Sequence, residues 1–256
     1  MDDYEFMGAL IAESDALPDK IRKLAEKNSA DACWAIAKDE RFKDFFGTPG
    51  HLQAIVDMAK QGTRFESITS DCIDECMAMI RSREVKPDVR VLGTRLGQIL
   101  THMRLESVHG RAGSTEALFG EVNKERAKDG RILVPIFVPE MEGGNELPHW
   151  VLASIDFGAK SLRIMDSAHE DRNEELVAMH NEMRATMAPL LAILVGFAVS
   201  SETGVPQQKN NVDCGVCVVE YARRIFEGEA LDTKTSWPDV RRDLTVALAR
   251  WWLSPT

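Results

Sequence analysis

The sequence lacks any apolar run long enough to cross a bilayer. Its longest, APLLAILVGFAV at residues 188–199, is interrupted by Gly196, whereas a spanning helix needs about 20 apolar residues. No secretory signal stands at the start, and the five cysteines are an odd number scattered along the chain. These absences predict no membrane span and free thiols in a reducing intracellular compartment, the nucleus or cytoplasm, or a host cell for a secreted effector.

Positive charge is also scarce. Lys and Arg number 31 against 41 Asp and Glu, which gives a formal net charge of -10 at pH 7. This balance opposes binding to a phosphate backbone, so we expect no nucleic-acid partner and favour a protein partner with a basic surface. The chain contains no internal repeat and no low-complexity segment.

What is present suits one full-sized globular domain with an extension. The chain has 256 residues, of which 44% are hydrophobic. Helix-period spacing, as in Leu17, Ile21 and Leu24, predicts a helical extension over residues 1–62. The main domain is expected over residues 63–256.

The main domain mixes helix and strand patterns. A helix is expected over residues 70–83, capped by Thr69 or Ser70, and further helices over 170–187, after residue 214 and over 236–253, where Pro238 suits a first turn. Runs rich in Ile, Val and Leu predict strands at 131–139, 149–157 and 161–167, with FGAK as a hairpin turn, and a buried strand at 190–199.

The hairpin brings an imidazole and a carboxylate together. If Gly158 and Ala159 form the turn, Val151 faces Asp166, and His149 becomes the diagonal neighbour of Asp166. Diagonal neighbours lie about 7 to 8 Å apart at the backbone, a gap that these two side chains can span. An Asp that accepts from one ring nitrogen fixes the tautomer of the imidazole and leaves the other nitrogen free to take a proton from a nucleophile.

Cys214 is the candidate nucleophile. Asp213 is a good capping residue, so the thiol is expected at the start of a helix over 215–227, where the helix dipole and a nearby imidazolium favour a thiolate. Gly215 would leave room for a substrate carbonyl, and the N–H groups of the helix start would bind an oxyanion. Gln208 would add a side-chain donor.

At these residues the sequence resembles the ubiquitin-like-modifier protease family of cysteine peptidases, the SUMO proteases and their relatives. The resemblance covers about residues 64–227 and keeps the chain order His, Asp, Cys. It is carried by three separated segments: HW at His149-Trp150, MDS around Asp166, and QxNxxDCG at Gln208, Asn210, Asp213, Cys214 and Gly215.

The resemblance implies an α+β, papain-like fold, a small mixed sheet packed by helices, with residues 63–256 as the protease domain. It implies a triad of His149, Asp166 and Cys214, with Gln208 in the oxyanion hole and Trp150 enclosing the Gly-Gly tail of the modifier. Where the family usually has a second Trp over this tail, the sequence has Ile68, with Phe65 nearby. The implied substrate is a ubiquitin-like modifier, SUMO first, or its conjugates; the implied enzyme is a monomer without cofactor or metal.

Other interpretations remain open. Alone, Cys214 could be a buried structural thiol, His149 a strand-end residue and Asp166 a turn former. Trp150 could belong to the hydrophobic core. An acetyltransferase of the same clan, a deubiquitinating enzyme and an inactive modifier-binding module are the alternative functions. Cys72 and Cys76 share a helix face, but no matching Cys or His pair completes a zinc site.

Overall fold

The computed structural model describes residues 68–83, 88–108, 118, 120, 122–124, 130–139, 149–168, 174–202, 204–208, 210, 212–231 and 234–253. The predicted extension over residues 1–62 and the candidate residue Phe65 lie outside them. In chain order the main elements are α5 (Ser70–Ser82), β1 (Val89–Val91), α6 (Arg95–Val108), β2 (Arg131–Val138), β3 (His149–Asp156), β4 (Ser161–Met165), α8 (Glu174–Ile193), β5 (Ala198–Glu202), α9 (Cys214–Glu227) and α10 (Trp237–Leu253).

The five strands form one mixed sheet in the order β1-β2-β3-β4-β5. The central strand β3 is antiparallel to its neighbours β2 and β4, and the outer strands β1 and β5 pair in parallel with β2 and β4 respectively. In the β3–β4 hairpin Leu152 pairs with Met165 and Asp156 with Ser161. This is the register predicted from the sequence, and it fixes the positions of the residues at the open end of the hairpin.

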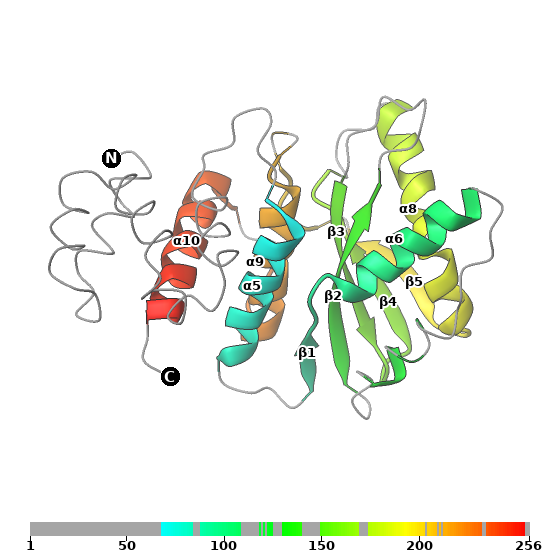
Figure 1. Cartoon of the computed structure of the whole chain (residues 1–256), viewed down its shortest axis with the longest axis horizontal. Coiled ribbons are helices and arrows are strands. Elements are labelled where there is room, and N and C mark those ends of the chain that lie inside the picture. The colour runs from blue at the N-terminus through cyan, green and yellow to red at the C-terminus, as the bar shows by residue number, and fades with distance from the viewer. Residues whose placement is uncertain are drawn as a thin grey trace, which may run out of the picture.

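Helices cover both faces of the sheet (Figure 1). Alternate residues along β2 and β3 enter two separate cores, as the two-residue period of a strand requires. Leu133, Trp150 and Leu152 join α5 and α9 in one core, whereas Val134 and Val151 join α6 and α8 in the other. Helix α10 packs on α5 and α9 from outside. The fold is α+β, as predicted.

Helix α6 and strand β1 were not predicted from the sequence. Helix α6 lies against β2 because Gly97 leaves space for the sheet backbone: a Cβ at this position would stand 2.2 Å from the carbonyl oxygen of Pro135. Thr101 hydrogen-bonds the Phe137 carbonyl at 2.7 Å from the same helix. The start of α6 is tied to α5, since Asp74 accepts a hydrogen bond from the Thr94 hydroxyl at 2.9 Å. These contacts fix the gap between α5 and α6.

The prediction of a buried strand at residues 190–199 is wrong. Residues 190–193 form the last turn of α8, and β5 begins only at Ala198 and is largely exposed. The apolar run continues the helix period, with Met183, Met187, Leu190 and Leu194 all buried on one side of α8. None of the helices in the described part of the chain is long and apolar enough to cross a membrane.

Candidate active site

The open end of the β3–β4 hairpin holds His149 and Asp166 in contact. The imidazole Nε2 lies 2.8 Å from Asp166 Oδ1, and both side chains are buried. The hydrogen bond inferred from the hairpin register is therefore confirmed. Asp166 Oδ1 also accepts from the backbone N–H of Ala168 at 2.9 Å. Asp166 is thus both a turn former and the partner of the imidazole.

The environment of His149 favours its charged form. Burial disfavours the imidazolium, but hydrogen bonds with Asp166 and Cys214 and the negative charges of these two side chains outweigh it, and the pKa of His149 is raised to about 10. Because Nε2 faces Asp166, Nδ1 is the ring nitrogen left for the thiol. The imidazole can therefore donate a proton at neutral pH.

Cys214 is the first residue of α9, as predicted. The first hydrogen bond of the helix runs from the Cys217 N–H to the Asp213 carbonyl at 2.8 Å. The N–H groups of the three residues before Cys217 have no acceptor within the helix because they stand in its first turn. The Cys214 side chain is only 1% exposed. The thiol therefore lies at a buried helix start that presents unused N–H donors.

The expected capping role of Asp213 is wrong. Asp213 occupies the N-cap position, but its side chain makes no capping hydrogen bond. Its carboxylate instead accepts from Arg241 of α10 at 2.8 Å and from the Asn210 amide at 2.7 Å. A buried guanidinium offers a carboxylate a stronger, charge-assisted partner than a backbone N–H does. The Asn210 side chain orders the preceding turn, since its oxygen accepts from the N–H groups of Val212 and Asp213.

The loop before Cys214 fixes Gln208 beside the segment that carries Asp166. The Gln208 N–H donates to the Ser167 carbonyl at 2.9 Å, and its side-chain oxygen accepts from the Ser167 hydroxyl at 2.8 Å. With the oxygen held in this way, Nε2 is the donor end of the amide. The neighbouring carbonyls are held from two helices, because Trp237 donates to Gln207 at 2.7 Å and the Tyr221 hydroxyl donates to Pro206.

A pocket of about 530 Å³ adjoins this site. Ile68 and Trp150, both predicted from the resemblance to line the tail site, form part of its wall. Phe137 stacks at a tilt against Trp150, with ring centroids 5.0 Å apart. Trp150 is only 6% exposed and belongs to the core as well, and its contact with a modifier tail stays a prediction. The remaining lining comes from α6 and the start of α5: Thr69, Ser70, Gln98, Thr101, His102 and Leu105.

Gly215 has a different surrounding from the one expected. A Cβ on Gly215 would lie 2.5 Å from Cγ1 of Ile68 and 3.4 Å from Cδ1 of Ile73. The space left by the missing side chain is therefore filled by α5 and its N-terminal flank, and not left open for a substrate carbonyl. Gly215 acts on the pocket indirectly, by allowing Ile68 to approach the start of α9.

Sequence reasoning missed the residues that hold the site in place. Ser167, Trp237 and Arg241 contact its loops, and only Ser167 lies within a recognised motif. Ser167 follows Asp166 in the MDS segment, but nothing in the sequence pairs it with Gln208. Trp237 and Arg241 stand four residues apart on one helix, a spacing that places them on the same face but does not name their partners.

Cys72 and Cys76 are buried free thiols in the core beside α9. The pKa of the Cys76 thiol is raised mainly by a hydrogen bond with Cys72 and also by burial. Within the described residues no group of three or more His, Cys, Asp or Glu side chains is arranged to hold a metal ion. The two cysteines pack as small apolar residues.

Comparison with known proteins identifies the family and the fold. A model of the Ulp1 protease family, C-terminal catalytic domain, matches residues 66–250. No curated protein matches the sequence. Among solved structures, the SUMO protease Ulp1 with its catalytic cysteine oxidised to a sulfinic acid is 17% identical, with a TM-score of 0.53 over 93% of this chain and 97% of that one.

Two further structures have the same fold. The Ulp1-like SUMO protease catalytic domain of Chaetomium thermophilum is 16% identical, with a TM-score of 0.52 over 94% of this chain and 91% of that one. The Ulp1 protease domain in complex with Smt3, the yeast ortholog of SUMO, is 17% identical, with a TM-score of 0.50 over 80% and 96%.

The fold and the family match define a cysteine peptidase with an α+β, papain-like catalytic domain. The chain belongs to the Ulp1 protease family.

Proposed function

We propose that this protein cleaves after the C-terminal Gly-Gly of a ubiquitin-like modifier, with SUMO or a SUMO-like protein as the leading candidate. The observation that carries the proposal is the buried 2.8 Å contact between His149 and Asp166, with Cys214 at the start of α9 acting on the same imidazole. The substrate class is supported by the family match and by solved relatives that are SUMO proteases, one of them bound to Smt3.

Acylation starts at the sulfur. The Cys214 thiolate attacks the carbonyl carbon of the last glycine, and the carbonyl oxygen becomes an oxyanion. The Cys214 N–H, unused within the helix, and Nε2 of Gln208 are the donors for this oxyanion. His149 then gives its proton to the leaving amine, the C–N bond breaks, and a thioester joins the modifier to Cys214.

Deacylation reverses the direction of proton transfer. His149, now neutral, takes a proton from a water molecule, and the resulting hydroxide attacks the thioester carbonyl. The C–S bond breaks, the thiolate and imidazolium are restored, and the new carboxylic acid of the modifier releases its proton to the solvent to become a carboxylate. Asp166 holds the imidazole orientation throughout and stabilises its charged form.

The pocket supports a glycine-ended tail. Ile68 approaches α9 so closely that it fills the space above Gly215, and Trp150, the neighbour of His149 on β3, lines the same pocket. A passage between an aliphatic and an aromatic wall has little room for side chains, so two consecutive glycines fit it and larger residues do not. The net charge of -10 would add attraction to a modifier with a basic surface.

The experiment compares kcat/KM for a modifier ending in Gly-Gly, the same modifier ending in Gly-Ala, and the bare C-terminal pentapeptide, at low and high salt. We expect cleavage of the Gly-Gly form, rejection of the Gly-Ala form, and an advantage of the full-length modifier over the peptide that shrinks with salt. Tolerance of Gly-Ala, or equal rates for protein and peptide, would contradict the proposed substrate class.

A parallel assay addresses the alternatives. Ubiquitin and SUMO substrates with the same leaving group would separate a deubiquitinating enzyme from a SUMO protease. Acetyl transfer from acetyl-CoA to a protein, in place of hydrolysis, would instead assign the chain to the acetyltransferase alternative. Binding of a modifier without turnover would identify an inactive binding module.

A further inference from the structure

The residue next to the proposed nucleophile carries a buried negative charge. Asp213 directly precedes Cys214, and its carboxylate is paired with Nη2 of Arg241 at 2.8 Å. The two side chains are 6% and 4% exposed. A buried ion pair adds little net stability, because removing both charges from water costs about as much as their attraction returns. Stability alone is therefore a weak reason for this pair.

A carboxylate in this place acts on the thiols of the same helix turn. Burial raises the pKa of the Cys217 thiol, and the charges of Cys214 and Asp213 raise it further. A like charge disfavours formation of a second anion nearby. Cys214 is the immediate chain neighbour of Asp213, so an uncompensated Asp213 carboxylate would oppose the thiolate that catalysis needs.

We propose that Arg241 is a positioning residue for the nucleophile: its guanidinium neutralises and orients the Asp213 carboxylate, so that negative charge can form on the Cys214 sulfur. This inference rests on the proposed role of Cys214. It means that α10, which lies beyond the recognised motifs, influences the charge at the start of α9 through the Asp213–Arg241 ion pair. The same helix holds the loop that carries Gln208, through the bond from Trp237 to the Gln207 carbonyl.

Other elements also bring groups to the thiol. The imidazole of His149 faces it from β3, and the carboxylate of Asp166 lies behind that imidazole. The flank of α5 contributes apolar side chains at the start of α9. The titratable and charged groups around the thiol include His149, Asp166, Asp213, Cys217 and Arg241, together with Tyr221 on α9 and Cys72 and Cys76 on α5.

The test measures the rate of Cys214 alkylation by iodoacetamide over a series of pH values, with the modified peptide identified by mass spectrometry. The pH midpoint of this rate reports the charge state of the thiol, whereas the plateau rate reports access to it. The variants are Arg241→Gln, Arg241→Lys, Asp213→Asn and the double variant Asp213→Asn/Arg241→Gln. Arg104→Gln is the matched control, because Arg104 forms a bidentate pair with Glu182 between α6 and α8, on the other face of the sheet.

Arg241→Gln should raise the pH midpoint by about one unit or more and slow alkylation at neutral pH by about tenfold or more, because it leaves Asp213 charged and uncompensated. Arg241→Lys should keep the wild-type midpoint. The double variant should restore the midpoint, since it removes the carboxylate as well. Asp213→Asn alone should not raise it, and Arg104→Gln should leave it unchanged.

A wild-type midpoint in Arg241→Gln, or a double variant whose midpoint stays as high as that of Arg241→Gln, would overturn the inference and leave Arg241 with a packing role. If Arg241→Gln does not fold, the comparison of Arg241→Lys with the double variant decides, because both must then show the wild-type midpoint. Alkylation needs no modifier, so a protein that rejects every modifier but follows this pattern would refute the proposed substrate and not the role of Arg241.

Discussion

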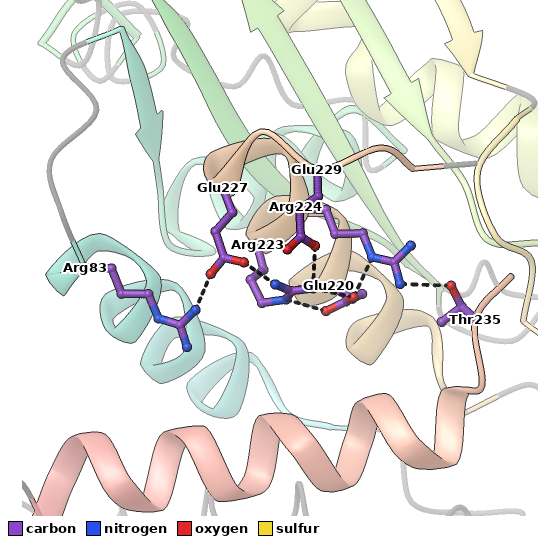
Figure 2. Close-up of polar contacts among 7 residues, drawn as sticks. All are labelled: Arg83, Glu220, Arg223, Arg224, Glu227, Glu229 and Thr235. Atoms are coloured by element: carbon purple, nitrogen blue, oxygen red, sulfur yellow. Dashed lines mark hydrogen bonds and ion pairs between the residues drawn. The ribbon is translucent and has the colours of Figure 1, made fainter. Parts of the chain in front are cut away.

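The two ends of α9 both carry ion pairs, but in opposite surroundings. At the C-terminal end Arg223 bonds Glu227, and Glu227 also bonds Arg83, the C-cap residue of α5 (Figure 2). The Arg83 side chain is 39% exposed there. At the N-terminal end Asp213 and Arg241 form a pair that is almost fully buried. The first group of charges faces water, which screens it; the second adjoins the proposed nucleophile.

The network at the C-terminal end also includes buried charges, because Glu220 and Arg224 are only 4% and 9% exposed. Glu220 accepts from both Arg223, at 2.8 and 2.9 Å, and Arg224, at 2.6 Å, and Arg224 also reaches Thr235 in the segment before α10 at 3.1 Å (Figure 2). If Glu220 is lost, Arg223 keeps its pairs with Glu227 and Glu229. The ion pairs at the C-terminal end therefore join α9 to its neighbours, whereas the pair at the N-terminal end adjoins the proposed nucleophile. Substitutions at the two ends should separate these roles.

The largest effect is expected at the first residue of α9. Cys214→Ser should reduce turnover of a modifier substrate by at least roughly 10³-fold, because an alcohol is a far weaker nucleophile than a thiolate for the same base. Cys217→Ala removes a thiol one turn further along the same helix and should retain most of the activity. Loss of turnover in Cys217→Ala with retention in Cys214→Ser would reverse the assignment.

Asp166→Asn should lower kcat by roughly 10² to 10⁴-fold while the fold survives, because the imidazolium loses its charged partner and the correct tautomer is no longer enforced. Asp156→Asn is the control: Asp156 lies on the same hairpin and pairs with Arg131 at 2.9 Å, away from the thiol. The assay measures kcat, and circular dichroism verifies folding. Near-full activity in Asp166→Asn would leave Asp166 with only a structural role in its turn.

The pH dependence of stability provides a smaller but specific effect. The pKa of His149 is raised from its ordinary 6.5 to about 10, so between these values the folded protein keeps a proton that the unfolded chain has released. The stabilisation from His149 is therefore fully present below pH 6.5 and is lost as the pH rises towards 10. The difference in free energy of unfolding between the wild type and His149→Gln, measured by denaturant titration, should shrink over this interval. A constant difference would show that the imidazole is neutral in the fold.

The smallest effect is expected at the other end of the helix. Arg83→Gln should cost at most about 1 kcal/mol in the free energy of unfolding, and less at high salt, because the pair is exposed and screened. The kinetic parameters should stay at their wild-type values. A large fall in kcat from this change would show that the C-terminal end of α9 also affects catalysis, and would contradict the different roles assigned to the two ends.

The centre of the site could be predicted from the sequence because the information for it is local. The hairpin register follows from a two-residue period and a short turn, so the residues alone indicate the contact of His149 with Asp166. The helix after Cys214 is likewise evident in its own residues. The strand expected at 190–199 failed because a short apolar run does not distinguish a buried strand from the end of a buried helix.

The supports of the site could not be predicted in the same way. Arg241 meets Asp213, and Trp237 meets Gln207, only because α10 folds back over α9. These contacts join positions 28 and 30 residues apart, and no periodicity links them. The room expected beside Gly215 could not be judged from the sequence, since only the packed position of Ile68 shows what fills it.

A modifier probe that carries an electrophile in place of its last scissile bond, after Gly-Gly, tests the proposed triad most directly. Incubation of the whole protein with SUMO and ubiquitin forms of this probe, followed by peptide mass spectrometry, locates the modified residue. We predict one covalent adduct, on the sulfur of Cys214, formed with a SUMO-like probe and lost in His149→Ala. An adduct on another cysteine, or no adduct with any Gly-Gly probe, would contradict the proposed triad and its substrate.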